Sequence, residues 1–316
     1  MAEERPVTVA LITHEACLAH DTGPWHPECP DRLRAVLRAL EGEAFSDLLR
    51  EQAPLATEEQ LARVHAERHI RTILDLAPGP GESIPLDPDT VFSPGSREAA
   101  LRAAGGAVMG VDAVMEGWAR RVFVAVRPPR HHPGRAQAMG FCLFSNAAVA
   151  ARHAQARWGL RRVAVVDFDV HHGNGTQDIF YDDPDLFYAS SHQFPCYPGT
   201  GTAAEHGVAG NVANAPLPPG ATGKDFRTVW SDVLLPALDG FAPELLIVSA
   251  GFDAHKADLL AQLRLETADF GWITEQLLRV ATRHCRGRLV SVLEGGYDLD
   301  ALAASAALHV RTLLQA

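Results

Sequence analysis

Short apolar runs rich in Val, Ile and Leu alternate along this chain with longer stretches in which apolar residues follow a helical period. Short runs of this kind are typical of strands buried on both faces of a sheet. We expect strands at 6–12, 121–126, 162–166, 186–190, 211–215, 245–249 and 288–293. We expect helices at 31–40, with Asp31 as N-cap, and at 57–64, 96–118, 145–158, 222–238, 267–282 and 298–314.

Strands that alternate with helices predict an α/β fold, with a mostly parallel sheet covered by helices on both faces. We find no internal repeat, low-complexity tract or linker, and therefore expect one domain over residues 1–316. The Gly105-Gly106 pair inside an expected helix favours close packing against a neighbouring element rather than a break.

Composition narrows the class of protein. Of the 316 residues, 47% are hydrophobic and 21% charged, as in globular proteins, and the net charge of −11 does not favour direct nucleic-acid binding. The five cysteines form no C-x-x-C pair, which argues against a zinc finger or a disulfide framework and favours a reducing compartment. With no signal peptide or membrane span in sight, we expect a cytoplasmic protein, and a homo-oligomer remains open.

The stretch from Val163 to Gly175 carries the first chemical signal. Asp167, Asp169 and His171 follow an apolar strand at alternate positions, and alternate residues of an extended chain point to the same side. Carboxylates and an imidazole that converge in this way suit a divalent metal such as Zn²⁺ once a third ligand joins them. A salt-bridged loop end is the alternative, and this motif alone does not decide between the two.

Chemistry-capable residues also follow the other expected strands. In open parallel sheets, ligands bind outside the carboxyl ends of the strands. Five such ends carry His, Asp, Asn, Glu or Tyr, which is difficult to explain as five unrelated helix caps. The segments are 127–133, 167–174, 191–194, 250–255 and 294–297.

Six motifs within these segments and beside them resemble those of a known family. They are RPP-x-HH, GFC-x-F, VDFDVHHGNGTQ, SSHQFPCYPGTG, SAGFDAH and LEGGYDL. They are similar to the zinc-dependent histone deacetylase family, most of all to its class II and bacterial branch with acetylpolyamine amidohydrolases and acetoin-utilisation-type proteins. The resemblance runs from about His14 to the end of the chain and implies the arginase/deacetylase fold.

The resemblance also implies a set of site residues. It assigns three metal ligands, Asp169, His171 and Asp253. It assigns two catalytic histidines and their hydrogen-bond partners, His131 with Asp167 and His132 with Asn174. It assigns Tyr297 as the oxyanion donor, Phe141, Gly140 and Tyr197 as the substrate tunnel, and Arg32 as the arginine of the acetate channel. Each assignment has an alternative when its residue is considered alone. Tyr297 could be a tyrosine in a turn, and Phe141 and Tyr197 could belong to the hydrophobic core. Arg32 could be an arginine at a helix start that pairs with an acid.

The function implied by the resemblance is metal-dependent hydrolysis of an acylated amine such as acetyl-lysine, an acetylpolyamine or another small acylamine. Zn²⁺ is the expected cofactor, with Fe²⁺ as an alternative because two carboxylates make a hard ligand set, and with a structural K⁺ nearby. The neutral amide of Asn174 would leave His132 able to accept a proton from water, while Asp167 would keep His131 more cationic.

Departures from the family pattern concern the inner cavity and the rim. Arg130 replaces a usual Gly before the histidine pair, Pro133 follows the pair, and 256–259 replaces a usual Asp-Asp-Pro-Leu. Two rival interpretations stay open. A ureohydrolase would need further aspartates at the places of Gly173 and His255, and a non-catalytic module would bind an acyl ligand without turnover.

Overall fold

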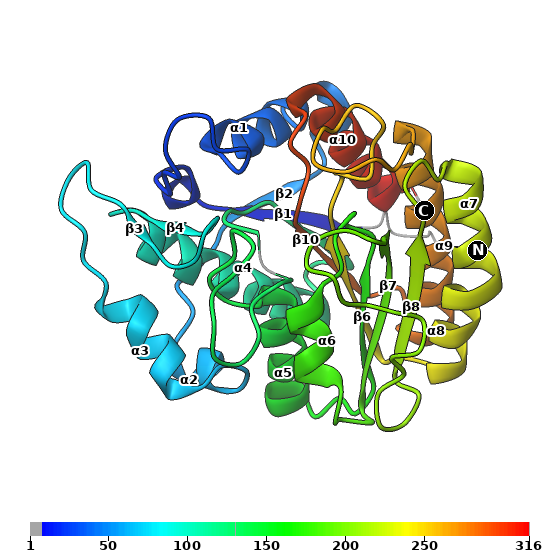
Figure 1. The fold of residues 1–316 in the computed structure, drawn as a ribbon. Coiled ribbons are helices and arrows are strands. Elements are labelled where there is room, and N and C mark those ends of the chain that lie inside the picture. The colour runs from blue at the N-terminus through cyan, green and yellow to red at the C-terminus, as the bar shows by residue number, and fades with distance from the viewer. Residues whose placement is uncertain (1–7, 130, 316) are drawn as a thin grey trace.

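The structure is a computed structural model that describes residues 8–129 and 131–315. An eight-stranded sheet in the order β2-β1-β5-β10-β9-β6-β7-β8 forms its centre, and every neighbouring pair in it is parallel (Figure 1). The strands are β1 (Val9–Thr13), β2 (Leu49–Gln52), β5 (Arg121–Val124), β6 (Val163–Asp167), β7 (Leu186–Gln193), β8 (Val212–Leu217), β9 (Leu245–Ala250) and β10 (Leu289–Leu293). A separate short hairpin joins β3 (Ile84–Pro85) to β4 (Val91–Phe92).

Helices cover both faces of the sheet, as the alternating pattern predicted. On one face lie α4 (Ser96–Glu116), α5 (Asn146–Trp158) and α6 (Asn174–Phe180). On the other lie α1 (Pro30–Ala39), α7 (Gly223–Val229), α8 (Leu235–Phe241), α9 (Thr267–His284) and α10 (Leu299–Gln315). Two short helices, α2 (Glu58–Ala62) and α3 (Glu67–Asp75), stand to one side (Figure 1).

The glycines of α4 bring this helix close to the sheet and to a neighbouring loop. A Cβ atom on Gly105 would lie 2.0 Å from the carbonyl oxygen of Pro54, and one on Gly110 would lie 2.9 Å from Val290 Cγ1. The helix continues through Gly105 without a break, so the prediction of close packing is confirmed.

Several elements differ from the sequence-based expectation. The edge strand β2 was not predicted, because all four of its residues are exposed and polar residues dominate it. The capping box at Thr57 is present, but α2 ends at Ala62, and α3 follows as a separate helix. The prediction that Asp31 caps the first helix is wrong, because Cys29 occupies the N-cap position and Pro30 begins the helix.

Strand β7 is longer than expected and runs on to Gln193. His192 and Gln193 pair with β8 instead of forming a loop after the strand, so the expectation that they follow a strand end is wrong. The expected helix at 222–238 is present as α7 and α8 joined by a π-helical turn, Trp230–Leu234. Across the described residues, no helix combines the length and the apolar character that crossing a bilayer requires.

Candidate metal-dependent active site

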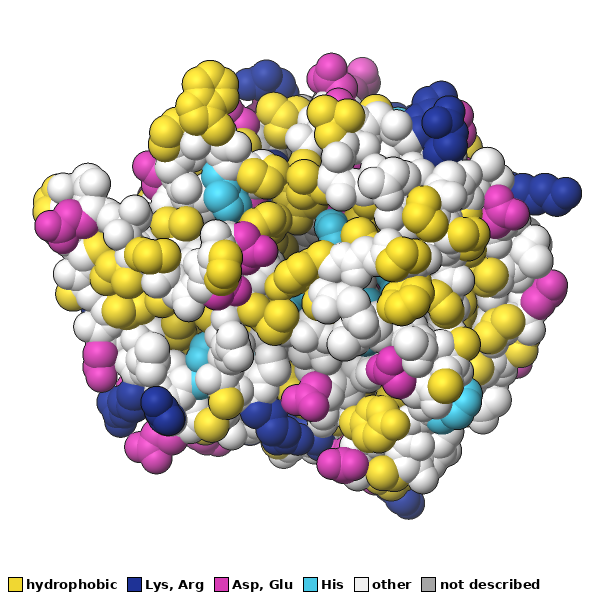
Figure 2. Space-filling view, in the orientation of Figure 1, with side chains coloured by type: hydrophobic (Ala, Val, Ile, Leu, Met, Phe, Trp, Pro, Cys, Tyr) yellow, Lys and Arg dark blue, Asp and Glu magenta, His cyan; other side chains and the backbone are white. Residues whose placement is uncertain are grey.

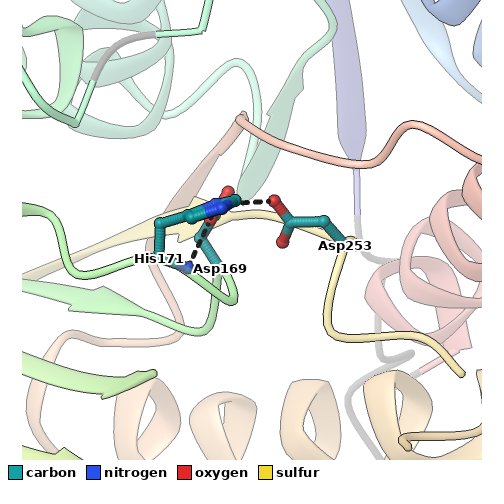
Figure 3. A group of neighbouring side chains, drawn as sticks. All are labelled: Asp169, His171 and Asp253. Atoms are coloured by element: carbon teal, nitrogen blue, oxygen red, sulfur yellow. Dashed lines mark hydrogen bonds and ion pairs between the residues drawn. The ribbon is translucent and has the colours of Figure 1, made fainter. Parts of the chain in front are cut away.

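Asp169, His171 and Asp253 meet at the carboxyl edge of the sheet (Figure 3). The first two follow β6 and the third follows β9, and these strands are hydrogen-bonded neighbours although they are far apart in sequence. One ligand atom from each residue lies within 4.8 Å of the others. His171 Nδ1 is 3.1 Å from Asp169 Oδ1 and 3.2 Å from Asp253 Oδ2.

The backbone fixes both carboxylates and leaves oxygens directed at the imidazole. Asp169 Oδ2 accepts a hydrogen bond from Gly295 N at 2.8 Å, and Asp253 Oδ1 accepts one from Val170 N at 2.8 Å. Gly295 has no room for a side chain, because a Cβ atom there would lie 2.1 Å from Asp253 Oδ2. The close approach of this glycine loop therefore keeps both acids in place.

The charges of the triad call for a cation. Burial and repulsion from Asp169 raise the pKa of Asp253 to about 7. Burial alone would lower the pKa of His171, but its interactions with the carboxylates of Asp169 and Asp253 outweigh burial and raise it well above its usual value. Nδ1 of His171 carries at most one proton and hydrogen-bonds Asp169 Oδ1, and among the described residues Asp253 Oδ2 has no hydrogen-bond partner. A divalent cation between these three side chains satisfies all of them, so the donor set fits a metal.

Two adjacent histidines line the next part of the site. His131 Nδ1 lies 2.9 Å from Asp167 Oδ2, and His132 Nδ1 lies 2.9 Å from Asn174 Oδ1. Their ring centroids are 4.1 Å apart, and the His132 ring is 6.0 Å from that of His171. The structure therefore brings both histidines, their two expected partners and the triad together.

The two histidines differ in proton affinity. Burial opposes protonation of both, but the carboxylates of Asp167 and Asp169 outweigh it at His131 and raise the pKa of this residue to about 10. Burial, together with the charges of His131 and His171, lowers the pKa of His132 well below its usual value. A carboxylate partner on one ring and an amide on the other thus give a cationic and a neutral imidazole side by side.

Tyr297 follows β10, at the same carboxyl edge of the sheet as the triad. Burial raises the pKa of its hydroxyl well above 10, and the nearby charges of Asp253 and Asp169 raise it further. The hydroxyl therefore stays protonated and able to donate a hydrogen bond near the two aspartates of the triad. Its ring is 6.0 Å from that of Phe141 in an edge-to-face arrangement.

Two aromatic residues, Tyr197 and Phe141, lie next to the histidine pair and Tyr297. Tyr197 is 39% exposed, with its ring 5.1 Å from that of His132, and the Phe141 ring lies next to that of Tyr297. Gly140 has a φ of +60°, and a Cβ atom there would lie 2.4 Å from His132 Cδ2. Figure 2 shows a hollow near the middle of one face, with histidine side chains at its bottom and hydrophobic side chains around it.

Comparison with known proteins identifies the family. The model of the histone deacetylase domain matches residues 26–313, which is most of the chain. The chain belongs to the histone deacetylase family. Its strand order and helix layers are those of the arginase/deacetylase fold. The crystal structure of the HDA15 HD domain superposes with a TM-score of 0.92 at 36% identity, covering 98% of this chain and 88% of that chain.

Sequence relatives carry names of deacetylases and amidohydrolases. The histone deacetylase-like amidohydrolase of Pseudomonas aeruginosa is 39% identical over 311 residues, covering 92% of this chain and 81% of that protein. Polyamine deacetylase HDAC10 of Mus musculus is 38% identical over 330 residues, covering 96% of this chain and 48% of that protein. An uncharacterised protein of Synechocystis sp. is 42% identical over 310 residues, covering 97% of this chain and 99% of that protein. The chain is thus a hydrolase of the deacetylase and amidohydrolase class.

Arg32, which the family resemblance places at the acetate channel, is completely buried beside Tyr297. It donates hydrogen bonds to the carbonyl oxygens of Gly296 and Glu294 and to Glu28 Oε1, and its guanidinium carbon lies 4.7 Å from the Tyr297 ring centroid. Arg32 is therefore both paired to an acid, as the alternative interpretation held, and next to the expected oxyanion donor.

Two buried acids near this candidate site were not singled out from the sequence. Glu28 binds Arg127 as well as Arg32, and Arg127, His20 and Arg32 together outweigh burial and hold its pKa well below the usual value. Asp258 accepts hydrogen bonds from the backbone nitrogens of Tyr297 and two other residues. Glu28 lies in the same HPE-x-P-x-R segment as Arg32, so a signal for it was present. Asp258 appeared only as part of a departure from the family pattern.

The ureohydrolase alternative gains no support from the positions that it needs. Gly173 has no side chain, and a Cβ atom there would lie 2.5 Å from Asp167 Oδ2. His255 Nε2 lies 3.3 Å from Thr267 Oγ1, away from the triad. Within 8–129 and 131–315, the triad is the one group of three side chains spaced to hold a metal. The expectation for Arg130 falls on a residue outside those described.

Proposed function

We propose that this chain is a metal-dependent amidohydrolase that removes an acetyl or another short acyl group from an acylated amine, with residues 1–316 as a single catalytic domain. The observation that supports this most strongly is the buried triad of Asp169, His171 and Asp253 next to a histidine pair of opposite proton affinity. A binding module has no need for two adjacent imidazoles with divergent pKa values, whereas acid–base catalysis does.

Zn²⁺ is the cation that we propose for the triad, with Fe²⁺ as the alternative for a ligand set of two carboxylates and one imidazole. A cation bound there supplies Lewis acidity toward the amide carbonyl and toward water. A structural K⁺ near residues 167–171 stays a prediction. Three protein ligands leave further coordination positions open, as substrate turnover requires.

His132 is the proposed general base. Its low pKa keeps it neutral near pH 7, and Asn174 at its Nδ1 leaves Nε2 available toward the centre of the site. His131 is held as a cation by Asp167, so it stabilises negative charge that develops in the transition state. His132 accepts a proton from the water that attacks the amide carbonyl. A protonated histidine of this pair then delivers a proton to the leaving amine nitrogen.

Tyr297 is the proposed oxyanion donor. Its hydroxyl keeps its proton because burial and the two aspartates raise its pKa, so it can donate to the amide oxygen as charge develops there. Phe141, Tyr197 and Gly140 are the proposed walls of a narrow tunnel, in which flat rings hold an extended apolar chain and exclude water. Arg32 is the proposed residue of the acetate channel.

Acylated lysine, acylated polyamines and other small acylamines all share a linear chain that ends in an amide. Relatives named as a polyamine deacetylase and as a histone deacetylase-like amidohydrolase support this range of substrates. The proposed test uses chelated protein reloaded with Zn²⁺ or Fe²⁺ and measures acid released from an acetyl-lysine peptide, an acetylpolyamine and a fluorogenic acylamide. Failure to release acid from all three substrates with either metal would contradict the proposal.

A matched pair of variants separates an enzyme from a binding module. His132→Ala is expected to abolish turnover, whereas His284→Ala, at the far end of α9 beside Asp239, is expected to leave it unchanged. Unchanged turnover in the His132 variant would remove the assigned base and favour a module that binds acyl ligands without hydrolysing them.

A further inference from the structure

The loop that carries Tyr297 contains little that could fix its own shape. Gly295 and Gly296 precede the tyrosine, and Gly296 has a φ of +125°, a conformation that residues with a side chain rarely adopt. Glycine gives the chain freedom to turn toward the site but does not hold it there. The position of the phenol therefore depends on side chains from other segments that bind this loop.

Asp258 holds the loop through one carboxylate oxygen, and its other oxygen binds its own segment. Its Oδ2 accepts hydrogen bonds from Tyr297 N at 2.6 Å and from Asp298 N at 3.2 Å. Its Oδ1 accepts one from Leu260 N at 3.1 Å. The side chain is buried, at 5% exposure, so these charge-assisted bonds act in a medium of low dielectric constant and are stronger than exposed ones.

Other residues hold the same loop on the opposite side. Arg32 binds the carbonyl oxygens of Glu294 and Gly296, and Asp169 binds Gly295 N. These contacts secure the carbonyl groups and the start of the loop, but they do not reach the tyrosine's own backbone nitrogen. That contact belongs to Asp258.

We propose that Asp258 is a positioning residue for the reaction, which sets the place of the Tyr297 hydroxyl relative to the metal ligands. The inference rests on the proposed function, because it assigns a role in placing the oxyanion donor. It also links two regions, because Asp258 belongs to the segment that carries Leu259, which is 93% exposed, and its Oδ2 binds the tyrosine loop. One side chain thus connects the segment that carries Leu259 to the proposed oxyanion donor, Tyr297.

The decisive variant is Asp258→Asn, which keeps the shape of the side chain but replaces one acceptor oxygen with an N–H₂ donor. Either Leu260 N or the tyrosine loop must then face a donor instead of an acceptor. We expect kcat to fall about 10- to 100-fold, because a displacement of about 1 Å at a catalytic group has an effect of that size. We expect KM to change less than about twofold and the bound metal per chain to stay the same.

Asp269→Asn is the matched control. Asp269 is also 5% exposed and also binds a backbone nitrogen, that of Glu266 at 2.8 Å, but it lies at the start of α9 and makes no contact with the tyrosine loop. This variant tests the general effect of removing a buried carboxylate that holds a loop. We expect its kcat to match that of the unmodified chain.

A double-mutant cycle distinguishes positioning of the tyrosine from general damage. In a Tyr297→Phe background, Asp258→Asn is expected to lower kcat by less than about twofold, because the hydroxyl that it positions is already gone. An undiminished loss in that background, a single variant with unchanged kcat, or a loss that follows lost metal would each overturn the inference. Absence of turnover in the unmodified chain would instead count against the proposed function.

Discussion

His309 offers a test of how the buried histidines respond to acid. It lies on α10 and is completely buried, with Nδ1 2.7 Å from Thr274 Oγ1 and Nε2 2.8 Å from Ser291 Oγ. Thr274 donates its own proton to the carbonyl of Phe270, so Nδ1–H donates to Thr274, and Nε2 accepts from Ser291. With one ring nitrogen donating and the other accepting, this network suits a neutral ring. Burial accordingly lowers the pKa of His309 to about 3.

The sign and size of the effect follow from this pKa. Between the folded value of about 3 and the usual unfolded value of about 6.5, the unfolded chain binds a proton that the folded chain does not. Stability is therefore present above pH 6.5 and is lost as the pH falls toward 3. Between pH 7.5 and pH 5, this single group removes about 2 kcal/mol, which is about 1.4 kcal/mol for each of about 1.5 pH units.

The assay compares the metal-free chain with His309→Gln by urea denaturation at both pH values. The variant is expected to be less stable at pH 7.5 by about 1–3 kcal/mol, because it loses buried hydrogen bonds. The unmodified chain is expected to lose about 2 kcal/mol of its free energy of unfolding between pH 7.5 and pH 5, whereas the variant is not, because glutamine does not titrate. The difference in free energy of unfolding between the two proteins is therefore expected to shift by that amount. Other titrating groups contribute equally to both proteins. The same difference in free energy of unfolding at pH 7.5 and at pH 5 would refute this prediction.

Three further predictions concern the site. Tyr297→Phe is expected to raise the barrier of the chemical step by about 2–4 kcal/mol with metal content unchanged, and an unaltered kcat would remove the role of oxyanion donor. Gly140→Ala is expected to lower kcat about 10- to 100-fold without unfolding the chain, because a Cβ atom 2.4 Å from His132 Cδ2 must displace the ring; circular dichroism and steady-state kinetics check both parts. Asp253→Asn is expected to lose most bound metal by elemental analysis and, with it, the increase in Tm that Zn²⁺ gives the unmodified chain.

The sequence predicted the sheet and the meeting of the strand-end residues for a physical reason. Apolar runs that are buried on both faces leave a clear pattern, and parallel strands bring their carboxyl ends to one edge, so the segments at 167–174 and 250–255 were expected at the same edge. The family resemblance then singled out Asp169 and Asp253 within them. The order of the strands along the sheet has no such local signature. That order, with β9 between β10 and β6, decides which ends are direct neighbours.

Other parts of the structure could not be predicted because their causes are not local. Strand β2 is held by its pairing with β1 rather than by its own polar residues, and the extension of β7 depends on β8. Asp258 is an ordinary acid in the sequence, and its importance arises only when the chain returns after β10 and places Tyr297 N against it. Backbone contacts across distant segments leave no trace in periodicity or spacing.

The neighbouring positions of β6 and β9 have a consequence for how the chain would acquire the proposed ion. Asp169 and His171 are synthesised early, but Asp253 follows a strand that must first dock beside β6. A partly made chain therefore presents two ligands and has little affinity for a cation, so loading waits for the register of the mature sheet. Metal binding would then report that β9 has paired with β6. The rate of metal uptake during refolding would measure when this pairing forms.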